Sequence, residues 1–237
     1  TITGNATDFN SVRGNLIGTN AAGTGALANS GAGVWIGSGA SDTTVGGSTP
    51  EERNIISGNT GAGVTLTGSG TSLNKVSGNY IGTDVTGTLD LGNQNEGVAI
   101  VLGASNNTIG GATPGERNII SGNVFEGVSI FSAGTTMNQV LGNFIGTDVS
   151  GTLPLGNFSG GVTIRFGATD NAIGGAGTGE GNVISSNDAD GINLSESGTE
   201  SNQIIGNVIG TDLGGNLDLG NSGAGVYIRN GAASNVV

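Results

Sequence analysis

The seven residues Gly78-Asn79-Tyr80-Ile81-Gly82-Thr83-Asp84 decide the fold, because the same motif returns at a fixed interval. It recurs at residues 142–148 as Gly-Asn-Phe-Ile-Gly-Thr-Asp and at 206–212 as Gly-Asn-Val-Ile-Gly-Thr-Asp, and a weaker copy occupies residues 14–20. The four copies start 64 residues apart. Such a fixed period is the signature of one structural unit stacked on itself. The chain is therefore predicted to be a repeat array.

Each 64-residue unit divides into two halves of unequal length, both opened by a G-V-x-I-like stretch. A 30-residue half begins at Gly97, and a 34-residue half begins at Gly127. Each half contains three short runs in which apolar and polar residues alternate, such as 97–100, 107–109 and 118–120. Short runs with β-branched residues and period-two alternation predict strands, and they are too short and too interrupted by glycine for helices.

Three strands per half, repeated in one order without reversal, predict the coil of a parallel β-helix. Each strand then pairs with its equivalent one coil later, about 4.8 Å away, and the crossover rule makes the coil right-handed. We expect an all-β, right-handed parallel β-helix solenoid with alternating 30- and 34-residue coils. It should form one domain over residues 1–237, with about seven coils, partial coils at both ends and an origin in a longer array.

Stacking would align asparagines in rows whose amides hydrogen-bond to one another and so satisfy polar groups beside the core. One predicted ladder contains Asn15, Asn54, Asn79, Asn118, Asn143, Asn182 and Asn207. A second contains Asn10, Thr43, Asn74, Asn107, Asn138, Asn171, Asn202 and Asn235. A third alternates amides with carboxylates and contains Asn20, Asn59, Asp84, Asn123, Asp148, Asn187 and Asp212. In that row we expect each aspartate to accept hydrogen bonds from the asparagines on either side.

An apolar row that should face outward lies beside the third strand of each coil. Its members are Leu16, Ile55, Tyr80, Ile119, Phe144, Val183 and Val208. An insertion of about eleven residues follows the third strand of every longer coil and brings a pair of leucines. These pairs are Leu89 and Leu91, Leu153 and Leu155, and Leu217 and Leu219. We expect the leucines to fold back over the apolar row, which would otherwise be an interaction surface.

The composition excludes several classes of protein. Glycine supplies 50 of 237 residues, but there is no G-X-Y period and there are only 3 prolines, so the chain is not collagen. The net charge of −12 and a single lysine disfavour nucleic acid as a partner, and no stretch approaches the ~20 apolar residues of a membrane span. The absence of Cys and His removes thiolate and imidazole chemistry and the usual zinc sites.

The strands and the segment Thr113-Pro-Gly-Glu-Arg-Asn-Ile-Ile-Ser-Gly-Asn123 resemble the β-helix repeats of the pectate-lyase-like superfamily. They look closest to repeat arrays of large bacterial secreted or surface proteins, and the resemblance covers essentially the whole chain. It implies a secreted or cell-surface location, which low charge and abundant Gly, Asn, Thr and Ser also favour. The superfamily contains enzymes, phage tailspikes and adhesins, so the fold alone does not imply an activity. The Gly-His-Gly, Asp-Pro-His and Arg-x-Pro-x-x-Arg segments of its enzymes are absent here.

Two groups of residues are candidates for binding. Arg165 and Arg229 share a row on the first strand with Phe131, and this cation-and-aromatic face could meet an acidic glycan, although solvated arginines are the simpler interpretation. Asp188 and Asp190 break the repeat pattern and could offer oxygen ligands to Ca²⁺. An acidic turn is the simpler interpretation of this pair.

The leading functional hypothesis is a non-catalytic structural or adhesive module of a secreted or surface protein. No catalytic residue and no cofactor other than Ca²⁺ is predicted, because every strongly marked residue is explained by the repeat. Open strand edges at the two ends of a solenoid favour homotypic stacking into filaments. The alternative is a β-helix that binds or degrades an acidic polysaccharide, with lyase- or hydrolase-like chemistry.

Overall fold

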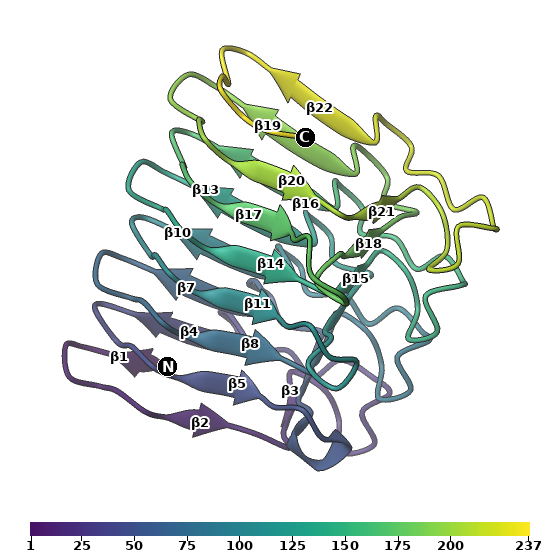
Figure 1. The fold of residues 1–237 in the computed structure, drawn as a ribbon. Helices are drawn as coiled ribbons and strands as arrows, with labels where there is room; N and C mark the ends of the chain where they lie inside the picture. Colours follow the sequence, from purple (N-terminus) through teal and green to yellow (C-terminus); the bar gives the residue numbers. More distant parts are fainter.

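The computed structural model describes residues 1–237 and contains 22 strands in three parallel sheets (Figure 1). The first sheet holds β1 (Ile2–Thr3), β4 (Val34–Gly37), β7 (Val64–Thr67), β10 (Val98–Val101), β13 (Val128–Phe131), β16 (Val162–Arg165), β19 (Ile192–Ser195) and β22 (Val226–Arg229). The second holds β2 (Ser11–Val12), β5 (Thr44–Gly46), β8 (Lys75–Ser77), β11 (Thr108–Gly110), β14 (Gln139–Leu141), β17 (Ala172–Gly174) and β20 (Gln203–Ile205). The third holds β3 (Leu16–Ile17), β6 (Ile55–Ile56), β9 (Tyr80–Ile81), β12 (Ile119–Ile120), β15 (Phe144–Ile145), β18 (Val183–Ile184) and β21 (Val208–Ile209).

The coil order confirms the predicted right-handed parallel solenoid of about seven turns. Val98 pairs with Val64 on one side and Val128 on the other, which are the expected 34- and 30-residue offsets. The strands begin one residue later than predicted, because the Gly or Asn that opens each run forms the corner and the strand follows it. One short 3-10 helix, η1 (Pro50–Glu52), interrupts this pattern, and no helix has the length and apolarity needed to cross a membrane.

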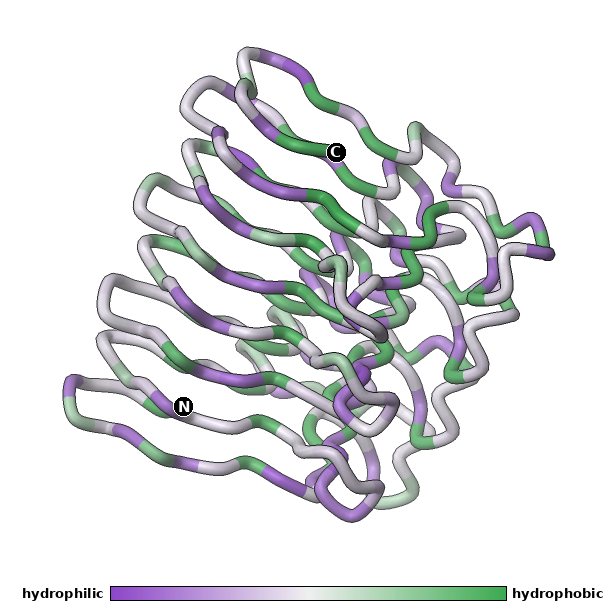
Figure 2. Tube along the Cα trace, in the orientation of Figure 1, coloured by the Kyte–Doolittle hydropathy of each residue, from purple (hydrophilic) through white to green (hydrophobic).

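The core is a column of aliphatic side chains inside the coil. It contains 26 buried residues, among them Ile36, Leu66 and Ile100 in the row predicted to face inward. Figure 2 shows the hydrophobic segments recurring at the same places in successive coils, with paler segments at many of the corners. Because each aliphatic side chain packs against its equivalent above and below, the core extends along the whole stack.

The first predicted asparagine ladder is confirmed, and the second is confirmed from Asn74 onward; the Asn10 side chain bonds to Asp8 O instead, and Thr43 meets Asn74 only through its backbone N–H. In the first, each side chain donates from Nδ2 to the Oδ1 of the next asparagine; for example, Asn79 donates to Asn118 over 3.1 Å and Asn118 to Asn143 over 2.9 Å. The second ladder runs in the same way from Asn74 to Asn235. These bonds satisfy buried amides at corners where no strand ladder is available.

The third predicted ladder is wrong in its aspartates and in Asn20, whose place at the start of the row is taken by Asn29. The row that forms contains asparagines alone: Asn29, Asn59, Asn93, Asn123, Asn157, Asn187 and Asn221. Asp84, Asp148 and Asp212 lie outside it. The inserted residues make a small hairpin that returns the chain to the stack, so the residue between Asn59 and Asn123 is Asn93 rather than Asp84.

Each of these aspartates instead closes its own hairpin. Asp84 Oδ1 accepts hydrogen bonds from the backbone N–H of Thr88 (3.2 Å) and of Leu89 (3.1 Å). Neighbouring hairpins also contact each other two coils apart, where the N–H of Val149 donates to Gly87 O over 2.9 Å. The hairpins therefore form a second, outer column beside the solenoid (Figure 1).

The apolar row beside the third sheet is covered, but the predicted leucines do not pack against it. The second leucine of each pair is half-buried (Leu91, Leu155) or buried (Leu219) outside this cluster. Five of its members are buried and pack together: Ile55, Tyr80, Ile119, Phe144 and Val183. The first leucine of every predicted pair points to solvent, with exposed fractions of 63% for Leu89, 58% for Leu153 and 49% for Leu217. The guanidinium groups of Arg53 and Arg117 cover the Tyr80 and Phe144 rings at 4.3 and 4.1 Å. These arginines occur only where the next coil supplies an aromatic ring; the equivalent residue in the third shorter coil is Gly181, and there the next coil has Val208 in place of a ring.

Candidate functional site

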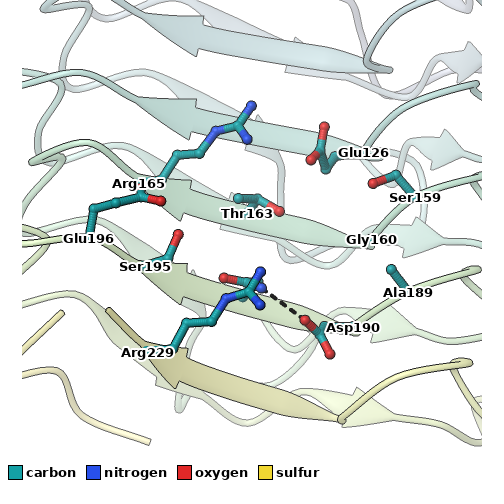
Figure 3. Close-up of a pocket in the computed structure, with 11 residues that line it drawn as sticks. Glu126, Ser159, Gly160, Thr163, Arg165, Ala189, Asp190, Ser195, Glu196 and Arg229 are labelled. Atoms are coloured by element: carbon teal, nitrogen blue, oxygen red, sulfur yellow. Dashed lines mark hydrogen bonds between the residues drawn. The ribbon is translucent and has the colours of Figure 1, made fainter. Parts of the chain in front are cut away.

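A shallow pocket of about 160 Å³ lies on the outer face of the first sheet, over β16 and β19 (Figure 3). Only one of its 11 lining residues, Ala189, is hydrophobic. The lining residues are Glu126, Ser159, Gly160, Thr163, Arg165, Ala189, Asp190, Asn193, Ser195, Glu196 and Arg229. In Figure 3 the side chains of Glu126, Arg165 and Arg229 extend over the sheet around this hollow. We call it the Glu126 pocket.

The pocket arises where one row departs from the repeat. The residues that immediately precede each first-sheet corner glycine stack on one another and are Ala32, Ala62, Glu96, Glu126, Gly160, Asp190 and Ala224. Backbone hydrogen bonds fix this alignment; Gly97 N donates to Glu126 O, and Gly161 N donates to Asp190 O, both over 3.0 Å. Gly160 has no side chain, so a gap opens between two acidic residues.

Buried polar atoms without a hydrogen-bond partner gather at this face. Only five such atoms occur in the molecule, and four are Glu126 Oε2, Ser129 Oγ, Arg165 Nε and Asn193 Oδ1. The Glu126 side chain is 8% exposed and Asn193 is 7% exposed. An unpaired buried polar group costs about 1–3 kcal/mol. The asparagine ladders satisfy their buried amides, whereas this face contains buried donors and acceptors that have no partner.

Aromatic rings hold the arginines of this face in position. The Arg165 guanidinium lies 5.4 Å from the centroids of both Phe131 and Phe166, which meet edge to face at 6.5 Å. Arg229 lies 4.8 Å from the Tyr227 ring. Cation–π contacts of this kind stabilise by about 0.5–1 kcal/mol at exposed sites and restrict the guanidinium to one side of the ring.

Glu96 lies one coil from Glu126 in the same row. Burial raises the pKa of Glu96 above its ordinary value, and the neighbouring charge of Glu126 adds to the shift, while Arg165 opposes it. A carboxylate that is unfavourably placed in the folded chain is a common mark of a functional site.

The sequence-predicted residues are only partly brought together. Arg165 and Arg229 line the pocket, and Phe131 supports Arg165 from beside it. Asp190 lines the pocket, but its oxygens accept hydrogen bonds from Asn193 Nδ2 (2.8 Å) and Ala224 N (2.9 Å). Asp188 is exposed and does not line the pocket. No group of three or more acidic side chains is placed to hold a metal ion.

Sequence reasoning missed Glu126 and Asn193. The available signal was a break in the repeat, because the position of Glu126 is alanine in three other coils. Asn193 stands in a mixed outward row with Thr163 and Tyr227, where no pattern separates it from its neighbours.

A second hollow on the outside of the second sheet contains charges that are already paired. Arg13 binds Glu52 over 2.6 Å, and Lys75 binds Glu116 over 2.5 Å. Because these groups satisfy one another, this hollow is a weaker candidate. Comparison with protein-family models, with curated proteins and with solved structures gives no match.

Proposed function

We propose that this chain is a rigid, non-catalytic structural module of a secreted or cell-surface protein, of the kind found in pectate-lyase-like repeat arrays. The observation that supports it is the continuity of the asparagine ladders, which link coil to coil along the stack. Each asparagine in the interior of a ladder ties three coils together. Asn143 donates to Asn182 and Ile109 and accepts from Asn118.

Single-molecule pulling from the two termini tests the load-bearing role. Coils of 30 and 34 residues should be released in steps of about 110 Å, from the length of an extended chain. Asn143→Ala should lower the unfolding force, because it leaves buried partners unpaired. Asn15→Ala, at an exposed ladder position, is the matched control. Equal forces for wild type and Asn143→Ala would contradict the proposal, as would release of product from a polysaccharide panel.

The second candidate function is adhesion to a polysaccharide, as the stalk or body of an adhesin. The open hydrogen-bonding atoms of the Glu126 pocket favour it. A glycan-array screen with and without Ca²⁺, beside an assay for the unsaturated product of uronate elimination, separates binding from cleavage. Saturable binding without product supports adhesion, and unsaturated product would replace it with a lyase.

A further inference from the structure

We propose that the Glu126 pocket binds one uncharged, hydroxyl-rich sugar unit of a polysaccharide. This inference rests on the adhesive role proposed above and names its ligand. The unpartnered atoms are of two kinds. Glu126 Oε2 and Asn193 Oδ1 are acceptors, and Arg165 Nε is a donor.

Hydroxyl groups match this mixture of donors and acceptors. A hydroxyl donates one hydrogen bond and accepts others, so neighbouring hydroxyls on one ring can donate to Glu126 and Asn193 while accepting from Arg165. A cation would pair with the acceptors, but the two arginines would repel it. An anion would pair with the arginines, but the Glu126 carboxylate would repel it.

The charge around the pocket supports an uncharged ligand over an acidic one. Its lining carries three acids, Glu126, Asp190 and Glu196, against two bases, Arg165 and Arg229. Sites that bind acidic polymers depend on an excess of basic groups. The net charge of −12 on the whole chain acts in the same direction.

An aromatic shelf beside the pocket fits the apolar face of a sugar ring. Phe166 is 54% exposed at a corner whose positive φ recurs from coil to coil, with +55° at Phe166, +55° at Leu102 and +53° at Asn230. The ring meets Phe131 edge to face and lies beside Arg165, which lines the pocket.

Calorimetric titration with neutral gluco-, manno- and galacto-oligosaccharides, and with a uronic-acid oligosaccharide, tests the proposal. We expect saturable binding of at least one neutral oligosaccharide. Glu126→Ala and Asn193→Ala should each weaken it by about tenfold or more, since each removes a hydrogen bond to the ligand. Thr65→Ala, in the same outward row as Asn193 but outside the pocket, and Glu51→Ala, which removes an exposed charge, are matched controls and should bind like wild type.

Glu126→Ala also gives a readout that a purely structural role would not produce. The variant restores the alanine of other coils and removes an unpaired carboxylate, so its Tm should rise by about 2–4 °C while binding falls. Equal binding in the Glu126→Ala and Thr65→Ala chains would overturn the inference, as would the absence of any sugar binding, in which case ordered water alone fills the pocket. Preference for the uronic-acid oligosaccharide would contradict the claim that the ligand is uncharged. The pulling experiments use the chain without sugar, so their outcome tests the structural module independently of the sugar-binding result.

Discussion

Asp84 holds its hairpin closed by accepting hydrogen bonds on both carboxylate oxygens. Burial pushes the pKa of Asp84 upward, but bonds from the Thr86 hydroxyl and from the N–H groups of Leu89 and Thr88 outweigh it, and the pKa lies below its ordinary value. Asn20, the equivalent residue in the first hairpin, accepts from Thr24 N with its amide oxygen. An acceptor is therefore the feature that this position needs.

Replacing Asp84 tests this requirement. Asp84→Ala should destabilise the hairpin by about 1–2 kcal/mol, because two backbone N–H groups lose their acceptor. Asp84→Asn should cost much less, since its amide oxygen remains. Hydrogen exchange at the Leu89 amide measures the local effect, and urea unfolding measures the global one. Equal losses in the two variants would show that the negative charge, and not the acceptor, holds the hairpin.

Glu96 is the residue whose ionisation opposes folding. Its folded pKa lies above the ordinary value of 4.5, so between these two values the folded chain keeps a proton that the unfolded chain has lost. The free energy of unfolding should therefore fall as pH rises through this window. Glu96→Gln should remove that slope and raise the Tm at pH 7, because the neutral amide carries no charge that burial disfavours. Glu51→Gln, at an exposed site, should do neither; a Glu96→Gln chain that matches wild type at pH 7 would contradict the assignment.

At the scale of elements, the hairpins depend on close contact with the rings beneath them. Gly87 lies against Tyr80, and Gly151 lies against Phe144, where a Cβ atom on Gly151 would come within 2.7 Å of the ring. These contacts, together with the arginines above the rings, bury the outward apolar row. The exposed leucines of the hairpins are not needed for that purpose.

The pair Gly151→Ala and Gly215→Ala separates ring contact from backbone strain. Both glycines have a φ close to +70° and occupy equivalent hairpin positions, but nothing lies near a Cβ on Gly215. Gly215→Ala should cost about 1 kcal/mol for strain alone, and Gly151→Ala about 1–3 kcal/mol more for overpacking. Thermal unfolding measures both. Similar losses would show that the hairpin lifts off the ring at no cost.

Sequence alone predicted the features that repetition controls. The strands and the ladders that contain Asn79 and Asn107 could be predicted because the same residue pattern recurs in every coil. The Asp84 ladder failed because a row is set by where the chain returns after a hairpin, and sequence spacing does not show that Asn93 takes the place in the stack. The Glu126 pocket was not predicted for the opposite reason. It depends on single residues that depart from the repeat, and their effect appears only when the coils are aligned in space.

At the scale of the molecule, carboxylates set the acid limit of stability. Hydrogen bonds from Leu217 and Asn216 N–H lower the pKa of Asp212, as the bonds described above do for Asp84. Both folded pKa values lie below the ordinary 3.8, so the stability that these groups contribute is present above pH 3.8 and is lost as pH falls below it.

We therefore expect the Tm to fall steeply below about pH 4 and the Asp84→Asn, Asp212→Asn double variant to show a shallower fall. Exposed Asp188→Asn should leave the profile unchanged. Calorimetry from pH 7 to pH 3 measures these curves. A double variant with the wild-type slope would place the acid sensitivity in other carboxylates.

The outer column of hairpins has a consequence for how such chains change in length. A hairpin contacts the next hairpin two coils away, through Val149 N and Gly87 O and their equivalents, and each corner amide contacts the next coil. Gain or loss of a single coil would break the hairpin contacts, whereas gain or loss of 64 residues would restore every contact. We therefore expect this architecture to tolerate insertions and deletions of two coils better than those of one coil, because the hairpins, and not the core, repeat every 64 residues.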